Sequence, residues 1–199
     1  MRFWKALVAV VGATALLGAL ATAASARNWS TSNQQIRSQF REVRFAGLFG
    51  TAVCQITMEG SFHARTTAKV VNALVGYIYR SVLGPCSTGT ATVLSETLPW
   101  HVRYRGFMGT LPNITKIEAN AIGASFNVRT PEGFTCLSRT TPEQPVIGSF
   151  NRDVVTKAIT TSVIAGTIET TCGFAGTFQS DNGLTRLSTT GALIFITLI

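Results

Sequence analysis

The 199-residue chain carries 17 lysines and arginines against 9 aspartates and glutamates, yet only 13% of its residues are charged. The basic balance favours anionic partners, but no run of lysine and arginine is dense enough to predict a nucleic-acid-binding surface. The length is that of one domain with a substantial core.

Residues 1–26 have the pattern of a secretory signal peptide. Arg2 and Lys5 precede an apolar run, and small residues ending in Ala26 follow it. The run is shorter than the roughly 20 apolar residues of a transmembrane helix. We therefore expect cleavage after Ala26, a secreted or extracytoplasmic protein, and no transmembrane helix in the mature chain. The polar residues 27–39 predict a loosely held N-terminal arm, and residues 40–199 predict a single β-rich domain.

Four cysteines, Cys54, Cys86, Cys136 and Cys172, fit two disulfides in an exported chain, because their number is even and the compartment is oxidising. Of the three possible connectivities, the order along the chain suggests Cys54 with Cys86 and Cys136 with Cys172. No pair has C-x-x-C spacing, so we expect no metal and no cofactor.

Two segments after the arm differ in their apolar period. Residues 51–62 alternate strictly, with Cys54 on the apolar face, which predicts a strand. Between Thr66 and Val82 the apolar residues fall on one arc of a helical wheel, and Gly84-Pro85 follows, which predicts one amphipathic helix.

The longest strand-like alternation runs from Leu98 to Val128. Trp100 and Tyr104 share one face and are expected in the core, while the other face carries a basic ladder of His101, Arg103 and Arg105. The apolar parity slips by one residue near 121–123, which predicts a β-bulge there.

These elements predict a mainly β fold. Short strands with turns about every ten residues favour an antiparallel β-sandwich or a closed β-barrel of about eight strands. The amphipathic helix is expected to pack against it.

The candidate catalytic residues are His63, His101 and Glu59. If their strands are neighbours, these side chains and the nearby arginines form a cluster suited to an anionic substrate. The plainer interpretation is that both polar strand faces are simply solvated. The candidate ligand-binding residues are His101, Arg103 and Arg105. The chain contains no G-x-S-x-G and no H-E-x-x-H motif.

The segments EGSFHART, from Glu59, and LPWHVRYRGFMGTLPNIT, from Leu98, resemble a group of uncharacterised secreted bacterial proteins. The resemblance implies an exported bacterial setting and carries no function across. The sequence thus favours an exported binding or structural protein at the cell envelope, with an anionic envelope component as its possible partner and no nucleic acid. A hydrolase acting on an envelope polymer or ester is the alternative, and a small membrane β-barrel is the second.

Overall fold

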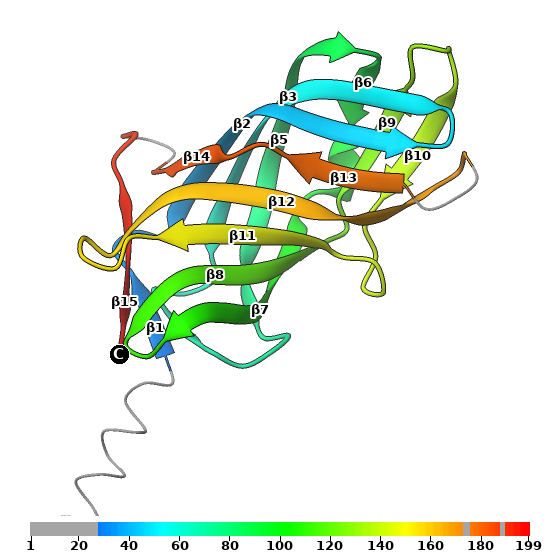
Figure 1. The fold of residues 1–199 in the computed structure, drawn as a ribbon. Helices are drawn as coiled ribbons and strands as arrows, with labels where there is room; N and C mark the ends of the chain where they lie inside the picture. Colours follow the sequence, from blue (N-terminus) through cyan, green and yellow to red (C-terminus); the bar gives the residue numbers. More distant parts are fainter. Residues whose placement is uncertain (1–27, 173–175, 188–189) are drawn as a thin grey trace, which may run out of the picture.

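A computed structural model describes residues 28–172, 176–187 and 190–199 (Figure 1). The predicted signal peptide lies outside the described residues. The described residues form a mainly β structure in which the strands pair antiparallel. The elements are β1 (Asn28–Thr31), β2 (Gln35–Gly47), β3 (Gly50–Phe62), β4 (Thr66–Ala68), β5 (Leu74–Thr88), β6 (Thr90–Val93), the 3-10 turn η1 (Ser95–Thr97), β7 (Trp100–Thr110), β8 (Asn113–Ile122), β9 (Ser125–Arg129), β10 (Thr135–Arg139), β11 (Val146–Arg152), β12 (Ala158–Thr170), β13 (Gly176–Ser180), β14 (Gly183–Arg186) and β15 (Ile194–Leu198).

Eight strands pair in a closed ring. The order is β2, β3, β5, β7, β8, β11, β12 and β13, and β13 pairs back onto β2. β14 continues the β13 position beyond a turn, pairing with both β12 and β2. This part of the molecule agrees with the predicted antiparallel fold of about eight principal strands.

The ring has two distinct ends (Figure 1). At one end β6, β9 and β10 extend the sheet, next to both disulfides, and we call this the disulfide end. At the other, β1 pairs with β4 and β15, and β15 pairs with β12. We call this the β1 end. Long strands of the ring contribute inward side chains to both ends, as β7 does with Trp100 and Tyr104.

The core is divided in the same way. One cluster, with Phe45, Trp100 and Phe126 at its centre, fills the disulfide end. A second cluster around Trp29 and Tyr104 fills the β1 end. Trp100 and Tyr104 are 1% and 3% exposed, as the sequence predicted. The exposed outer face carries His101, Arg103 and Arg105 instead, because successive side chains of a strand point to opposite sides.

The predicted amphipathic helix is wrong. Its residues form β4, a turn at 69–73, and the first half of β5. Val70 and Val71, which the helical wheel placed in the core, are 60% and 62% exposed. The segment is rich in β-branched and aromatic residues, which favour a half-buried strand, and pairing with β3 and β7 overrides the apparent helical period.

Two other expectations differ from the structure. The polar residues of the predicted arm belong to the sheet, since Asn28–Thr31 is β1 and β2 begins at Gln35. The parity slip near 121–123 marks a break between strands rather than a bulge. β8 ends at Ile122, and Gly123 has a φ of 91° that redirects the chain into β9.

Both suggested disulfides are confirmed. Cys54 bonds to Cys86, which lies directly opposite it on β5, and Cys136 bonds to Cys172. The first disulfide joins two neighbours of the ring, and the second ties β10 to the residues that follow β12. Each bond closes a loop of more than 30 residues, with sequence separations of 32 and 36.

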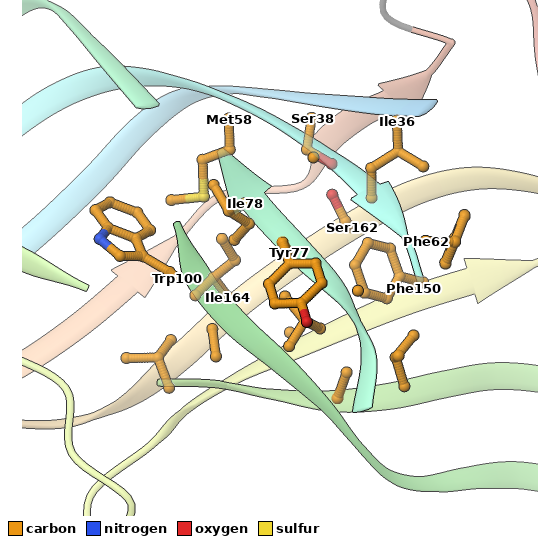
Figure 2. A pocket seen from close by; sticks show the side chains of 18 of the residues that line it. Ile36, Ser38, Met58, Phe62, Tyr77, Ile78, Trp100, Phe150, Ser162 and Ile164 are labelled. Atoms are coloured by element: carbon orange, nitrogen blue, oxygen red, sulfur yellow. The ribbon is translucent and has the colours of Figure 1, made fainter. Parts of the chain in front are cut away.

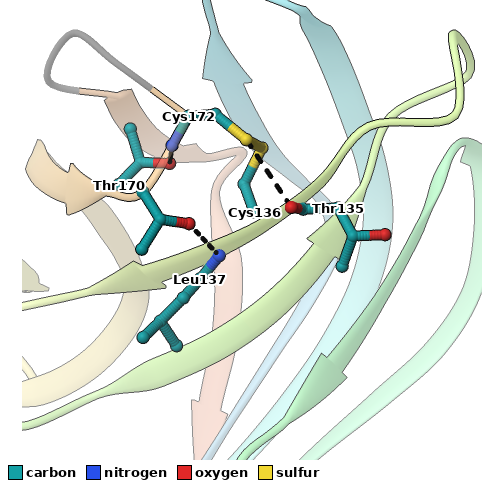
Figure 3. The surroundings of a disulfide bond; sticks show 6 residues. Thr135, Cys136, Leu137, Thr170 and Cys172 are labelled. Carbon is teal, nitrogen blue, oxygen red and sulfur yellow. Dashed lines mark hydrogen bonds between the residues drawn. A yellow bond between two sulfur atoms is a disulfide. The ribbon is translucent and has the colours of Figure 1, made fainter.

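Hydrogen bonds fix the surroundings of the second disulfide (Figure 3). The Cys172 backbone N–H donates to Thr170 Oγ1 over 3.3 Å, and the Leu137 N–H donates to Thr171 Oγ1 over 3.0 Å. The Cys172 sulfur lies 3.7 Å from the Thr135 carbonyl oxygen. This is a contact without a shared proton, because the sulfur belongs to the disulfide. The disulfide end is thus held both covalently and by hydrogen bonds.

Candidate binding site

An apolar cavity of about 90 Å³ lies inside the ring, between the two core clusters (Figure 2). Trp100, Phe126 and Phe178 reach it from the disulfide end. Trp29 and Tyr104 reach it from the β1 end. The cavity therefore extends along the interior and separates two groups of close-packed side chains.

Small residues on neighbouring strands explain why the middle of the ring is not filled. Gly60, Gly76, Ala119, Ala121 and Gly148 all line the cavity. Gly148 pairs directly with Ala119, so β8 and β11 both present a minimal side chain at one level of the ring. A well-packed interior normally leaves few voids larger than a water molecule. A continuous cavity of this size is therefore a specific feature of the chain.

Two of these glycines are also required by the backbone. A Cβ on Gly60 would lie 2.5 Å from the Tyr77 carbonyl oxygen, and one on Gly76 would lie 2.2 Å from the Ser61 carbonyl oxygen. The register of β5 shifts against its neighbours beside both positions. The close approach of β3 and β5 thus excludes side chains here and keeps this wall of the cavity thin.

Three buried hydroxyls form a short chain in the wall of the cavity. Thr185 Oγ1 donates to Ser162 Oγ over 2.9 Å, and Ser38 Oγ lies 3.1 Å from Thr185 Oγ1. Since the single Thr185 proton goes to Ser162, Ser38 must be the donor to Thr185. The proton of Ser162 then has no acceptor among the described residues. Ser38 and Ser162 both line the cavity (Figure 2), so this proton is available to a bound molecule.

The β1 end of the cavity has further polar groups. Trp29 Nε1 is buried without a hydrogen-bond partner, and the buried side chain of Tyr104 also lines the cavity. Burial raises the pKa of Tyr104, so its hydroxyl stays protonated and remains a donor. Buried tryptophan and tyrosine normally find a partner for these groups. The interior is therefore apolar overall but not fully satisfied.

The structure does not bring the predicted catalytic residues together. β3, β5 and β7 are neighbours, but Tyr77 of β5 lies between the two histidines. Its ring centroid is 6.3 Å from that of His63 and 5.4 Å from that of His101, both edge-to-face. Glu59 lies apart from them, in ion pairs with Arg37 at 3.5 Å and Arg80 at 3.1 Å.

The basic ladder is on the outer face of the ring, away from the cavity. Arg103 donates to the backbone carbonyl of Asn72 over 3.2 Å, and Arg105 lies 3.6 Å from a carboxylate oxygen of Glu118. His101 is exposed beside them. These side chains therefore lie in a row along the exposed face of β7 and do not converge on a concave site.

His63 lies in an open polar depression of about 630 Å³, together with Arg65 and residues of the β1–β2 connection. Ser61, Phe62 and Tyr77 line both this depression and the cavity, so a single layer of residues separates the two. His101 does not line the depression. Of the predicted site residues, only His63 is thus close to a concave surface.

Sequence reasoning missed the cavity. The signal was the presence of glycine and alanine at inward positions in the middle of strands, as at Gly60, Ala119 and Gly148. A single small residue in a strand has many explanations when it is considered alone. The closure of the ring brings these small residues to the same height inside it. The order of the strands cannot be predicted from any single segment of the sequence.

Within residues 28–172, 176–187 and 190–199, no group of three or more His, Cys, Asp or Glu side chains is arranged to hold a metal ion. No helix in this part of the chain is long and apolar enough to cross a membrane. Comparison of the chain with protein-family models, with curated proteins and with solved structures gives no match.

Proposed function

We propose that the protein is an exported, disulfide-bonded β-domain that binds a small apolar molecule inside its ring of strands. The observation that carries this proposal is the apolar cavity between the two core clusters. Ligand sites are typically concave and mostly apolar, with a few polar groups that orient the ligand. Rings of about eight strands are just wide enough to hold one small ligand.

The size of the cavity limits the ligand. On the same measure one water needs about 10 to 15 Å³, and an apolar cavity of about 150 Å³ binds one benzene molecule, so a cavity of about 90 Å³ admits a smaller apolar molecule. A hydrocarbon chain of about four carbons is of that size. The free proton of Ser162 favours a ligand with one hydrogen-bond acceptor, for example a short-chain alcohol or carboxylic acid.

The proposed extracytoplasmic setting is supported by the two disulfides, which persist in oxidising compartments. The excess of basic residues supports a location next to an anionic envelope component. The hydrolase alternative would need His63 and His101 to converge, and the intervening Tyr77 ring favours binding over catalysis.

The test is titration of the protein with 1-butanol and with butanoate by isothermal titration calorimetry. We expect saturable binding, and at least a tenfold loss of affinity in Ala119→Leu, because the larger side chain occupies the cavity. Ala165→Leu is the matched control, since Ala165 is exposed on β12. If Ala119→Leu does not fold, Gly148→Ala is the second variant, because its new Cβ meets no atom closer than 3.6 Å. No binding by the unaltered protein, or equal losses in variant and control, would refute the proposal.

A further inference from the structure

Exposed apolar side chains gather at the β1 end, outside the cavity. Val70 and Val71 lie in the turn before β5, and Phe107, Met108 and Leu111 lie at the end of β7 and in its hairpin with β8. Their exposed fractions range from 37% to 62%. Large exposed apolar residues in one place mark an interaction surface more often than scattered ones do.

Contacts join the turn before β5 to β7, the first strand of the hairpin. The turn runs antiparallel to β7, since Asn72 N–H donates to the Tyr104 carbonyl and Tyr104 N–H donates to that of Ala73. Three residues earlier, Lys69 Nζ lies 6.0 Å above the centre of the Phe107 ring. The turn itself is closed by a hydrogen bond from the Ala73 N–H to the Val70 carbonyl, so Val70 and Val71 lie in a turn that is joined to β7, and Met108 and Leu111 lie further along the β7–β8 hairpin. We call these five apolar residues, with Lys69, Arg103 and Lys116, the hairpin patch.

The hairpin patch is basic. The segments 60–73 and 97–117, which contain it, carry five basic residues (Arg65, Lys69, Arg103, Arg105 and Lys116) and no acidic residue. Among the described ion pairs only Arg105 has an acidic partner, Glu118. Arg103 and Lys116 are thus free to act on an external anion, whereas the Lys69 ammonium nitrogen is buried.

We propose that the hairpin patch docks on the surface of an anionic phospholipid membrane. The aliphatic and aromatic side chains would enter the boundary between headgroups and acyl chains, and Arg103 and Lys116 would contact the headgroup phosphates. Such surfaces combine buried apolar area with electrostatic attraction to anionic lipids. Lys69 itself does not reach the headgroups, because its ammonium nitrogen is buried, and this burial lowers its pKa. The proposal does not depend on a ligand in the cavity, because the patch is on the outside.

The test is flotation of the protein, purified after export, with vesicles of phosphatidylglycerol and phosphatidylcholine in equal parts, and with phosphatidylcholine alone. We expect binding to the anionic vesicles that weakens with rising salt, and at least tenfold weaker binding to the neutral ones. Val70→Ser/Val71→Ser should weaken binding about tenfold, because two insertable side chains are lost. Leu48→Ser/Val82→Ser is the matched control, since these residues are 60% and 44% exposed and lie outside the patch. All variants share the same N-terminus, so any contribution from residues 1–27 cancels.

Failure to float with anionic vesicles would overturn the proposal. So would equal losses in the variant and the control pair. Size-exclusion chromatography distinguishes another occupant: a dimer that Val70→Ser/Val71→Ser converts to a monomer, without vesicle binding, would assign the patch to a second copy of the chain. Butanol binding in the cavity is measured without vesicles, so failure of one proposal does not affect the other.

Discussion

The disulfide end of the ring is closed by two covalent bonds and an aromatic cluster, whereas the β1 end is closed by short strands and one buried tryptophan. At the disulfide end Trp100 Nε1 donates to Thr97 Oγ1 over 2.9 Å, and the Trp100 ring meets Phe126 edge-to-face. At the β1 end Trp29 also meets an aromatic ring edge-to-face, that of Phe62, but its Nε1 has no partner.

This difference suggests that the two ends of the ring have different roles, one in stability and one in binding. Local stability is not uniform in proteins, and binding regions are commonly drawn from the less stable parts. At the disulfide end the buried Trp100 indole is hydrogen-bonded, whereas the β1 end combines the unpaired Trp29 indole, the hairpin patch and the polar depression beside His63. The first end anchors the fold, and the second is the one at which we expect binding.

The largest expected effect comes from removing a disulfide. Cys136→Ala/Cys172→Ala should lower the free energy of unfolding by about 3 to 4 kcal/mol, because a closed loop restricts the unfolded chain. Urea unfolding followed by tryptophan fluorescence measures the change. As a control for the remaining Cys54–Cys86 disulfide, both proteins are also unfolded in the presence of the same reductant. A loss below about 1 kcal/mol would contradict the anchoring role.

A matched pair of tryptophan substitutions compares the two ends directly. Both side chains are 1% exposed, so Trp100→Phe and Trp29→Phe remove similar buried volume. Trp100→Phe also breaks a hydrogen bond, whereas Trp29→Phe removes a donor that had no partner. We expect Trp100→Phe to cost about 1 kcal/mol more in the free energy of unfolding, measured by urea titration. The reverse order would show that Trp29 has a partner that matters more than the Thr97 bond.

The smallest expected effect is a pH dependence at the β1 end. Asp153 follows β11, where Oδ1 accepts hydrogen bonds from the Thr156 N–H at 2.6 Å and the Val155 N–H at 2.9 Å. These bonds, Thr156 first, hold the pKa of Asp153 below its usual value. A carboxyl with a lowered folded-state pKa stabilises the fold above its unfolded pKa, about 3.9, and this stability is lost as the pH falls through the folded value.

Asp153→Asn should therefore lower the midpoint of thermal unfolding at pH 6, with a difference from the unaltered protein that shrinks towards zero at pH 2. Glu143→Gln, at an exposed position in the turn before β11, is the control and should change little. A difference that stays constant with pH would show that the charge of Asp153 does not matter.

Much of the fold followed from local patterns. The strict alternation of 51–62 predicted β3, and the parity of the segment after Leu98 placed Trp100 and Tyr104 inside. Both depend on side-chain period alone, which is a local property of an extended strand. The disulfide pairs followed from their order along the chain, since near neighbours in sequence met in space.

The segment 66–82 shows where a local pattern is not sufficient. Its apolar residues satisfy a helical period, but Gly76 packs against the Ser61 carbonyl and the strand β5 pairs on both sides. Backbone pairing with distant strands decided between two conformations that the same residues allow. The predicted histidine cluster has the same origin: its polar faces were placed correctly, but the side chain between the histidines belongs to β5, the element that was predicted as a helix.

The sequence by itself determined a mainly antiparallel β-domain with two disulfides, and which residues of several strands face inward. Only the tertiary structure decided that the strands close a ring, that glycine and alanine from distant strands meet at one level to leave a cavity, and that the 69–71 turn lies against Phe107. The physical reason is that inward facing depends on neighbours along one strand, whereas a cavity or a surface patch depends on which strands are neighbours in space.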